Sequence, residues 1–430
     1  MVNKKEEYFH FGTVKNMFWL MDRNNDIHIR YVATLDHAID ETIIENAWEK
    51  TKRVYPIIDT VIDVVDWDIY LYTADGENPV MHGENPAMPG SEAVGSRVVT
   101  LTVHQNKITL NAFHTLVDGG GLMQIMQTLL YAYLSEYTGE TDETAPVQLS
   151  ENRNVSEYYR IPGEGDLGEF EPQPLFLYPF KREFVEDEEM RPGDDGERVF
   201  GSLQFDRGSF LKLCKMYGAN PSAMLCLWFT RAFFILHPEE RRDVGLAITI
   251  SDRKTFGMEK YISNCLSMGI LDISYEMAMK SEPTKTDRQD GDTDTDAATA
   301  EAIAKIRRDI ATQRTDDYIR TFWQFESTYG WNHIHRCGLV TYIGTVDVGS
   351  LTGHITNFRM ETNSCNNLYL TELNDSFILM FQFGRVTDIY MKQFAEMLTE
   401  AGVEVTVNTE PETVITDRDE KILEYVNSPI

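Results

Sequence analysis

A histidine and an aspartate that could act in one reaction lie close together in the segment 113–121, which reads FHTLVDGGG. A histidine has an unperturbed pKa of about 6.5, so a neutral imidazole at His114 could take a proton from a hydroxyl or an amine and return it to a leaving group. Asp118 could orient this imidazole directly, or it could anchor the segment by pairing with a distant arginine. Gly119 and Gly120 permit tight backbone geometry and the close approach of a ligand. The segment therefore predicts general-base chemistry at His114.

The spacing H-x-x-x-D-G is a weak pattern on its own, because it also fits a turn with a surface histidine and an aspartate that caps the next helix. The surrounding sequence adds information. Residues 97–104 alternate as a strand does, and 108–113 return as a second strand after a turn. Apolar residues from Leu122 to Tyr137 recur with the 3.6-residue period of a helix. The segment is thus expected at a strand-to-helix junction, where rigid neighbours can hold catalytic groups in place.

Strands and helices alternate in both halves of the chain, which predicts an α/β fold. We expect strands at 26–36, 97–104, 108–113, 199–205, 338–343, 366–373 and 377–383, and helices at 39–54, 122–137, 221–233, 298–323 and 386–401. The segment that separates the two halves is rich in proline and acidic residues. We therefore expect two domains, 1–180 and 199–430, joined by an acidic linker at 181–198.

The charge of the chain restricts its partners. Sixty-nine acidic residues against 39 basic ones give a formal net charge of -30, which repels nucleic-acid phosphates and anionic lipid surfaces. We expect no nucleic-acid partner, and an anionic co-substrate would need a local basic patch. No apolar run is long enough to span a bilayer, and the apolar piece 17–21 is followed at once by charged residues. The expectation is a cytoplasmic protein without a membrane span.

Metal and nucleotide motifs give weaker signals. Five cysteines without a C-x-x-C pair argue against a disulfide framework or a zinc ribbon and are expected to be buried thiols. Residues 163–168 match G-x-G-x-x-G, but they follow a proline instead of a strand and include two acidic residues. His333 and His335 could share one face of a strand, yet no third ligand stands nearby. We predict no metal site and no permanently bound cofactor.

The segment 113–121 resembles the H-x-x-x-D-G motif of the chloramphenicol acetyltransferase-like superfamily, which includes alcohol O-acetyltransferases and the condensation domains of nonribosomal peptide synthetases. The resemblance extends to the chain length, the opening strand and helix that end in RVYP at 53–56, the hairpin before His114 and the helix start GANPSA at 218–223. The stretch 247–264 is similar to a family segment in which an arginine follows a strand and an asparagine closes the next loop. Arg253 and Asn264 stand at those places.

The resemblance implies two α/β domains with mixed sheets flanked by helices, and an active-site tunnel between them. It makes His114 the general base and implies a structural ion pair between Asp118 and Arg253. It places Gly119, Gly120 and Asn264 at the substrate. Residues 340–344 look like the Ser-Asn-x-Gly strand of the family, although only the final glycine agrees, and this places Thr341 and Tyr342 at the substrate as well.

Three functional hypotheses follow from the resemblance. The first is a coenzyme A-dependent acyltransferase, with acyl-CoA as donor and a small-molecule alcohol or amine as acceptor. The second is a condensation-type enzyme that uses an acyl carrier protein, and the third is a catalytically silent binding module. Phe113 stands where condensation domains usually carry another histidine, which favours the first hypothesis. The intact His114, Asp118 and glycine run argues against the third.

Overall fold

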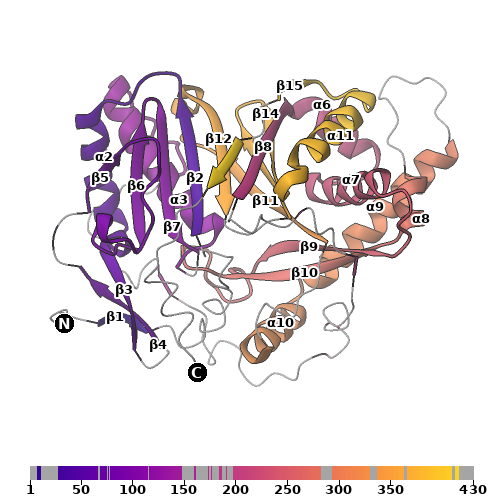
Figure 1. Cartoon of the computed structure of the whole chain (residues 1–430), viewed down its shortest axis with the longest axis horizontal. Helices are drawn as coiled ribbons and strands as arrows, with labels where there is room; N and C mark the ends of the chain where they lie inside the picture. Colours follow the sequence, from indigo (N-terminus) through magenta and orange to yellow (C-terminus); the bar gives the residue numbers. More distant parts are fainter. Residues whose placement is uncertain are drawn as a thin grey trace.

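The structure is a computed structural model of the 430-residue chain. It describes residues 7–10, 28–65, 68–74, 76, 78–114, 116–147, 159–160, 173, 176, 184–185, 190, 197–281, 293–329, 337–362, 366–408 and 412–415. These residues form two α/β lobes that lie side by side, with a small sheet below the first lobe (Figure 1).

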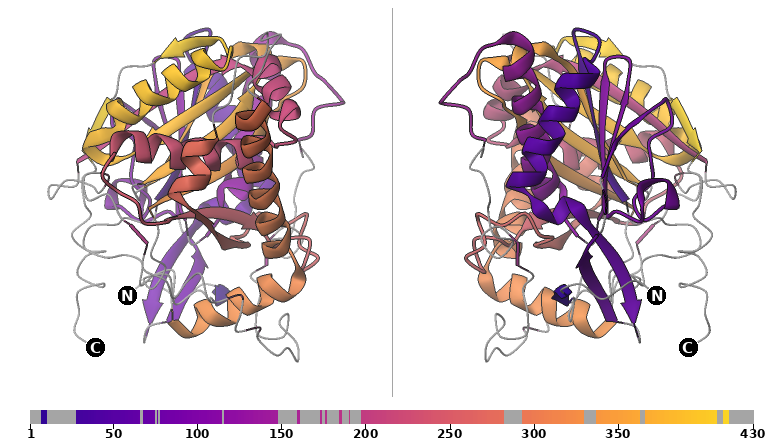
Figure 2. Two further views of the ribbon diagram at one scale, coloured as in Figure 1. Left: turned by 90° about the vertical axis from the view of Figure 1, so that its right-hand side faces the viewer. Right: turned by 90° about the vertical axis from the view of Figure 1, so that its left-hand side faces the viewer.

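The first lobe is built on a five-stranded sheet with the order β12-β2-β7-β6-β5. Its strands are β2 (His28–Leu35), β5 (Val80–His82), β6 (Val99–His104), β7 (Lys107–Phe113) and β12 (Ile355–Thr362). β5 is parallel to β6, and the other neighbours are antiparallel. Two helices, α2 (Glu41–Val54) and α3 (Gly119–Thr138), pack beside each other on one side of this sheet (Figure 2).

The second lobe is built on an eight-stranded mixed sheet with the order β10-β9-β11-β13-β14-β8-β15, in which β16 also pairs with β8. The strands are β8 (Glu197–Asp206), β9 (Val244–Ser251), β10 (Leu266–Ile273), β11 (Gly338–Val346), β13 (Asn367–Leu373), β14 (Ser376–Gln382), β15 (Val405–Asn408) and β16 (Glu412–Ile415). β11 runs parallel to both of its neighbours, β9 and β13. The helices are α6 (Arg207–Met216), α7 (Pro221–Leu236), α8 (Tyr275–Lys280), α9 (Thr293–Gln313), α10 (Asp316–Tyr329) and α11 (Thr387–Glu400).

A small third sheet and several 3-10 helices lie outside the two large sheets. A three-stranded sheet with the order β1-β4-β3 projects below the first lobe in Figure 1, and it consists of β1 (Glu7–His10), β3 (Thr60–Val65) and β4 (Asp68–Thr73). Short 3-10 helices occur at η1 (Pro56–Asp59), η2 (Glu92–Val94), η7 (Leu351–His354) and η8 (Gly384–Val386).

Strand β12 belongs to the second half of the sequence but completes the sheet of the first lobe. It pairs antiparallel with β2, with Ile355 opposite Leu35 and Thr362 opposite Ile29 (Figure 1). Its apolar side chains Phe358 and Met360 are buried in the core of the first lobe. The chain then returns to the second lobe through β13. The two lobes are therefore interlocked by a strand that crosses between them.

The expected mixed α/β fold with helices flanking the sheets is confirmed. The helix predicted at 298–323 is wrong in one respect, because the structure has two helices, α9 and α10, separated by a turn at Arg314 and Thr315. Thr315 ends one helix and starts the next, since its hydroxyl accepts from the backbone N–H of Tyr318. The proposed linker at 181–198 lies mostly outside the described residues, as do the G-x-G-x-x-G segment and His333 and His335.

Other expectations concern cysteines and membrane spans. Cys214, Cys226, Cys265 and Cys337 are buried free thiols, as predicted, and Cys365 lies outside the described residues. Among the described helices, none is by itself long and apolar enough to cross a membrane. The pair α6 and α7, bent by 83° where they meet, reaches that length and composition only jointly.

Candidate active site

His114 lies where β7 ends and the turn into α3 begins. It lines an open cavity of about 260 Å³ to which strands of both sheets contribute. The first lobe contributes the start of α3 and residues of β12, and the second contributes residues of β9, β11 and β13. The lining residues are His114, Asp118, Gly119, Gly120, Thr249, Ile250, Ser251, Arg253, Leu266, Arg314, Leu339, Thr341, Tyr342, Ile343, Met360, Thr362 and Tyr369. The histidine thus faces the space between the lobes.

The surroundings of His114 keep its imidazole neutral. Desolvation lowers the pKa of His114 below its ordinary value of 6.5, and this effect outweighs the nearby backbone groups and the negative charge of Asp118, which raise it. Within the described part of the chain, the buried Nδ1 atom has no hydrogen-bond partner. A neutral imidazole on a cavity wall can accept a proton at neutral pH.

Asp118 is a structural residue in this geometry. Its carboxylate is buried and caps α3, with Oδ1 accepting from the backbone N–H of Gly121 at 2.8 Å. The same oxygen lies 2.7 Å from Nη2 of Arg253, and Oδ2 accepts from the backbone N–H of Cys265 at 3.1 Å. These bonds direct the carboxylate toward the helix start and the second lobe. The described hydrogen bonds of Asp118 do not include one to His114.

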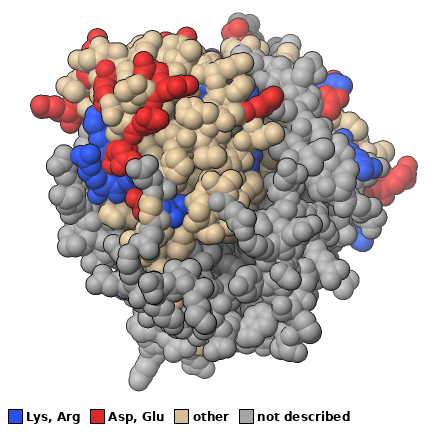
Figure 3. Space-filling view, turned by 60° about the vertical axis from the view of Figure 1, so that its left-hand side comes forward, with Lys and Arg blue, Asp and Glu red and all other residues tan. Residues whose placement is uncertain are grey.

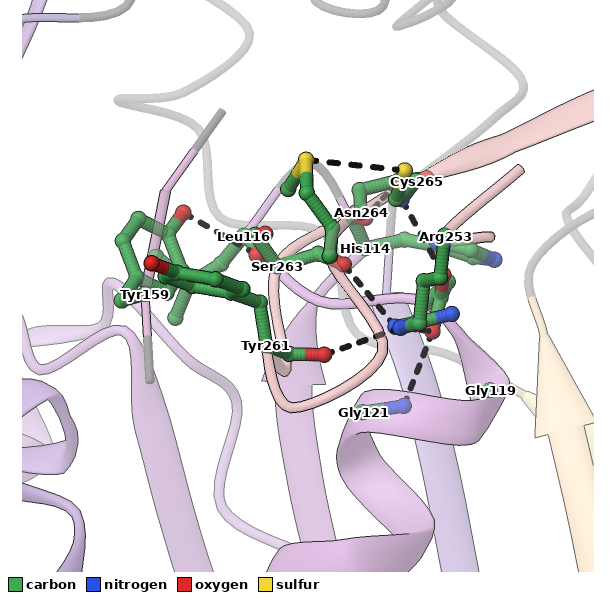
Figure 4. A network of polar contacts seen from close by, with 12 residues as sticks. His114, Leu116, Gly119, Gly121, Tyr159, Arg253, Tyr261, Ser263, Asn264 and Cys265 are labelled. Carbon is green, nitrogen blue, oxygen red and sulfur yellow. Dashed lines mark hydrogen bonds and ion pairs between the residues drawn. The ribbon is translucent and has the colours of Figure 1, made fainter. Parts of the chain in front are cut away.

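Arg253 joins Asp118 to the loop that follows β9. Its Nε donates to the carbonyl of Tyr261 at 2.8 Å, and its Nη2 donates to the carbonyl of Ser263 at 3.0 Å (Figure 4). The guanidinium therefore sits between the loop 261–265 and the first turn of α3. An arginine fork with several acceptors holds a buried carboxylate with defined geometry. The ion pair implied by the motif is present, and its partners come from different lobes.

Asn264 holds the backbone on the other side of the histidine. Its side-chain amide donates to the carbonyl of His114 at 2.9 Å, and its own N–H donates to the carbonyl of Leu116 at 3.3 Å. Tyr159 adds a hydrogen bond from its hydroxyl to the same Leu116 carbonyl at 3.0 Å. The sequence placed Asn264 at the substrate, whereas in the structure it is absent from the cavity lining and holds the backbone at His114 and Leu116.

The three glycines after Asp118 differ in what they must accommodate. A Cβ atom at Gly121 would lie 1.8 Å from the carbonyl oxygen of Ile262, which is a backbone atom in the second-lobe loop. A Cβ at Gly119 would meet the Tyr31 hydroxyl at 3.2 Å, and one at Gly120 would find its nearest neighbour, Asp118 Oδ1, at 3.5 Å. Gly121 is therefore the position at which the absence of a side chain lets the two lobes approach. The sequence singled out Gly119 and Gly120 instead.

Thr341 and Tyr342 lie on β11 and are among the residues that line the cavity. The hydroxyl of Thr341 is 3.3 Å from that of Thr249. The Tyr342 hydroxyl contacts the Glu372 carboxylate, and burial together with this carboxylate raises the pKa of Tyr342 to about 12. Tyr342 is thus a neutral phenol at physiological pH.

Arg314 is a cavity residue that the sequence reasoning missed. It lies in the turn between α9 and α10, and its exposed side chain has no hydrogen bond or ion pair within the described ranges. Because the sequence predicts one helix at 298–323, it does not place Arg314 in a turn at the cavity. The signal was the sequence Thr315-Asp316-Asp317, which combines a capping residue with two acidic residues and is typical of a helix start.

Asp252 is a second buried carboxyl beside the site. Its oxygens lie 2.7 Å from Nε1 of Trp323 and 2.8 Å from Oγ of Ser267. Desolvation raises the pKa of Asp252 to about 8, although both hydrogen bonds act in the opposite direction. Asp252 directly precedes Arg253, whose guanidinium pairs with Asp118.

Comparison with known proteins places the fold. No protein-family model and no curated protein sequence matches the chain. The first condensation domain of the calcium-dependent antibiotic synthetase is 13% identical over 92% of this chain and 97% of its own length, with a TM-score of 0.63. Trichothecene 15-O-acetyltransferase from Fusarium sporotrichioides is 11% identical over 90% and 94%, with a TM-score of 0.60.

A third structure, TRI101 from F. sporotrichioides complexed with coenzyme A and T-2, is 10% identical over 91% of this chain and 97% of its own, with a TM-score of 0.55. These neighbours are an acetyltransferase, a condensation domain and a coenzyme A complex that share one two-lobed architecture. The chain therefore has the fold of the chloramphenicol acetyltransferase-like and condensation-domain superfamily, as the motif resemblance implied.

The close contact at Gly121 leads to a first prediction. Gly121→Ala should lower the free energy of unfolding by about 3 kcal/mol, because the new methyl group must displace the Ile262 backbone. Gly120→Ala is the matched control, since its methyl group would meet only ordinary contacts, and we expect a change of about 0.5 kcal/mol or less. Urea unfolding measures both. Equal stabilities for the two variants would contradict the assigned contact.

The buried Asp252 leads to a prediction about pH. A carboxyl whose pKa is raised in the folded state binds a proton that the unfolded chain releases, so its contribution to stability falls as pH rises from about 4 toward 8. Asp252→Asn should remove this decline, because the amide is neutral throughout and can pair with both Trp323 and Ser267. Unfolding free energies measured at several pH values between 4 and 8 test this. A wild-type decline that persists unchanged in the variant would contradict it.

Proposed function

We propose that this protein is an acyltransferase that moves an acyl group from a thioester to a hydroxyl or amine acceptor, with His114 as general base. The observation that carries the proposal is that a neutral histidine lines a cavity between the two lobes. Asn264 holds the backbone of this histidine, and Asp118 caps the start of α3, which follows it. General-base catalysis needs such a fixed geometry, because the base must lie within hydrogen-bond reach of the proton that it removes.

The reaction would proceed in a ternary complex without a covalent enzyme intermediate. His114 takes the proton from the acceptor, and the acceptor oxygen or nitrogen attacks the thioester carbonyl. The tetrahedral intermediate then collapses, the carbon–sulfur bond breaks, and the imidazolium returns the proton to the departing thiolate. Because Nδ1 is buried, Nε2 is assigned to the proton transfer. This step typically contributes about 10²- to 10⁴-fold to the rate.

Other cavity residues would bind the substrates. Gly119 and Gly120 line the cavity together with His114, and Thr341 and Tyr342 of β11 line it as well. We assign these groups to substrate contacts, with Thr341 the better hydrogen-bond donor because the Tyr342 hydroxyl already contacts Glu372. Asp118 and Arg253 also border the cavity, but their polar atoms bond to each other and to the backbone.

Acyl-CoA is the proposed donor, since it is an acyl thioester and TRI101, which shares the fold, is described in complex with coenzyme A. An anionic donor needs a cation in a chain of net charge -30. Of the two arginines on the cavity, Arg253 is committed to Asp118, and Arg314 has an exposed side chain available for phosphate. Arg314 therefore supports a donor that carries negative charge.

A carrier-protein donor remains the alternative, because condensation domains share the fold. An acidic carrier protein would need a basic docking face. On the face of the molecule that Figure 3 presents, the described Lys and Arg side chains lie in a group at the left and in further groups at the right edge, each beside Asp or Glu, and a broad area with few charged side chains lies between them. Among the described residues of this face, Lys and Arg therefore form no continuous basic surface for an acidic carrier protein, which supports the small-molecule thioester.

Thiol release tests the proposal. Wild-type protein is incubated with acyl-CoA donors of different chain lengths, pooled alcohols and pooled amines, and free thiol is measured. We expect at least one donor to be consumed only when acceptor is present, and His114→Ala to lower kcat/KM by about 10²- to 10⁴-fold. The control is His104→Ala at the end of β6, which is outside the cavity lining and should keep full activity.

The outcomes separate the hypotheses. The acid limb of kcat/KM should have its midpoint below pH 6.5, because the pKa of His114 is lowered. Turnover of acylated carrier protein but not of acyl-CoA would favour the condensation-type alternative. If neither donor is consumed by the wild type, or if His114→Ala is as active as His104→Ala, the general-base proposal fails.

A further inference from the structure

Two histidines and an aspartate meet at the end of β2 that is remote from His114. Asp36 and His37 directly follow β2, and His354 directly precedes β12. The pairing of Leu35 with Ile355 and the backbone hydrogen bond from Asp36 N–H to the His354 carbonyl at 3.0 Å make Asp36 and His354 neighbours. The sheet register therefore brings together residues that are 318 positions apart in sequence.

The donor atoms of these three side chains converge. Nδ1 of His37 lies 2.5 Å from one carboxylate oxygen of Asp36, and Nδ1 of His354 lies 3.0 Å from the other. One donor atom from each residue lies within 4.8 Å of the others. In a tetrahedral zinc site with ligand distances of about 2.1 Å, donor atoms are about 3.4 Å apart. Small side-chain rotations at the half-exposed Asp36 and His354 would bring the donors to that spacing.

A second layer of residues holds His37. Its ring stacks on Tyr137, with centroids 3.8 Å apart and an interplanar angle of 6°. Its other nitrogen, Nε2, lies 3.4 Å from the hydroxyl of Tyr133, which also accepts from the backbone N–H of Asp40 at 3.0 Å. The Tyr133 oxygen has a second lone pair for Nε2–H, and that tautomer leaves the Nδ1 lone pair for a metal ion. Metal-binding histidines are oriented by this kind of contact through the second nitrogen.

We propose that Asp36, His37 and His354 form a binding site for a divalent transition metal ion, with zinc as the expected occupant. Two imidazole nitrogens and a carboxylate oxygen suit Zn²⁺, and water would complete the coordination because the site is at the surface. The ion would join the end of β2 to η7 and β12, and so would fasten the strand that crosses between the lobes.

The site is distinct from the catalytic cavity. His28, at the start of β2, pairs with Phe113 beside His114, whereas Asp36 lies eight residues further along the strand. At about 3.3 Å per residue, the two positions are roughly 26 Å apart. The metal ion is therefore assigned a stabilising role, and its test does not depend on the proposed acyl transfer.

Zinc titration of the untagged, full-length protein tests the site. After treatment with chelator and its removal, ZnCl₂ is titrated by calorimetry, and Tm is measured with and without Zn²⁺. We expect one ion per chain with a micromolar Kd and a rise in Tm of several degrees. His37→Ala and His354→Ala should each weaken binding at least tenfold. His82→Ala is the matched control, because His82 is also exposed and faces a single carboxylate, Glu41, at 3.9 Å.

Zinc-edge X-ray absorption on the wild type gives an independent readout if a variant folds poorly. Two imidazole ligands with oxygen ligands would support the assignment. The proposal is overturned if the wild type takes up no Zn²⁺ at micromolar concentration, if the absorption spectrum shows fewer than two imidazoles, or if folded His37→Ala and His354→Ala variants bind Zn²⁺ as tightly as His82→Ala.

Discussion

The buried carboxylate of Asp118 is the interaction on which the candidate site depends. A charge removed from water must be matched by hydrogen bonds and an opposite charge, or the folded state becomes much less stable. Asp118 meets this requirement with the N–H of Gly121, the N–H of Cys265 and the guanidinium of Arg253. The first belongs to its own helix, and the other two belong to the second lobe. The hydrogen bonds and the ion pair of the Asp118 carboxylate therefore align the start of α3 with the loop 261–265.

That alignment determines where the histidine lies. The loop 261–265 contacts the segment 113–121 through the bonds of Asn264 to His114 and Leu116, and through the close approach of Ile262 to Gly121. Strand β12 adds a second connection between the lobes, because it completes the first sheet while its neighbours in sequence belong to the second lobe. His114 is consequently held on the cavity by contacts from both lobes.

The sequence predicted the features that depend on local patterns or on the motif. The start of α7 at Asn220 and Pro221 and the strand-to-helix junction at His114 both follow from residues within a few positions of one another. The helix cap at Asp118 was the alternative that the local pattern also allowed, and the structure has it. The Asp118–Arg253 pair came from the family resemblance, because nothing local connects residues 135 positions apart. The roles of Gly121 and Asn264 depend on contacts with a distant loop, so spacing alone did not show them.

Arg314 and the cluster of Asp36, His37 and His354 show a similar limit. Thr315 is a local indication of the break between α9 and α10. The apolar periodicity on both sides of it instead favours one continuous helix. No local sequence pattern predicts the cluster of Asp36, His37 and His354, because it arises from the pairing of β12 with β2. Local sequence patterns predict the helices and strands of this fold. Which side chains meet in space depends on the register between strands that are distant in sequence.

A double-mutant cycle on Asp118 and Arg253 tests the central claim, that their buried pair holds the segment 113–121 between the lobes. Asp118→Asn, Arg253→Met and the double variant are compared by urea unfolding. Each single variant should lose about 3 kcal/mol or more of unfolding free energy, because it leaves a buried charge without its partner. The double variant should lose at least about 1 kcal/mol less than the sum. Losses that add to within about 0.5 kcal/mol would contradict the account.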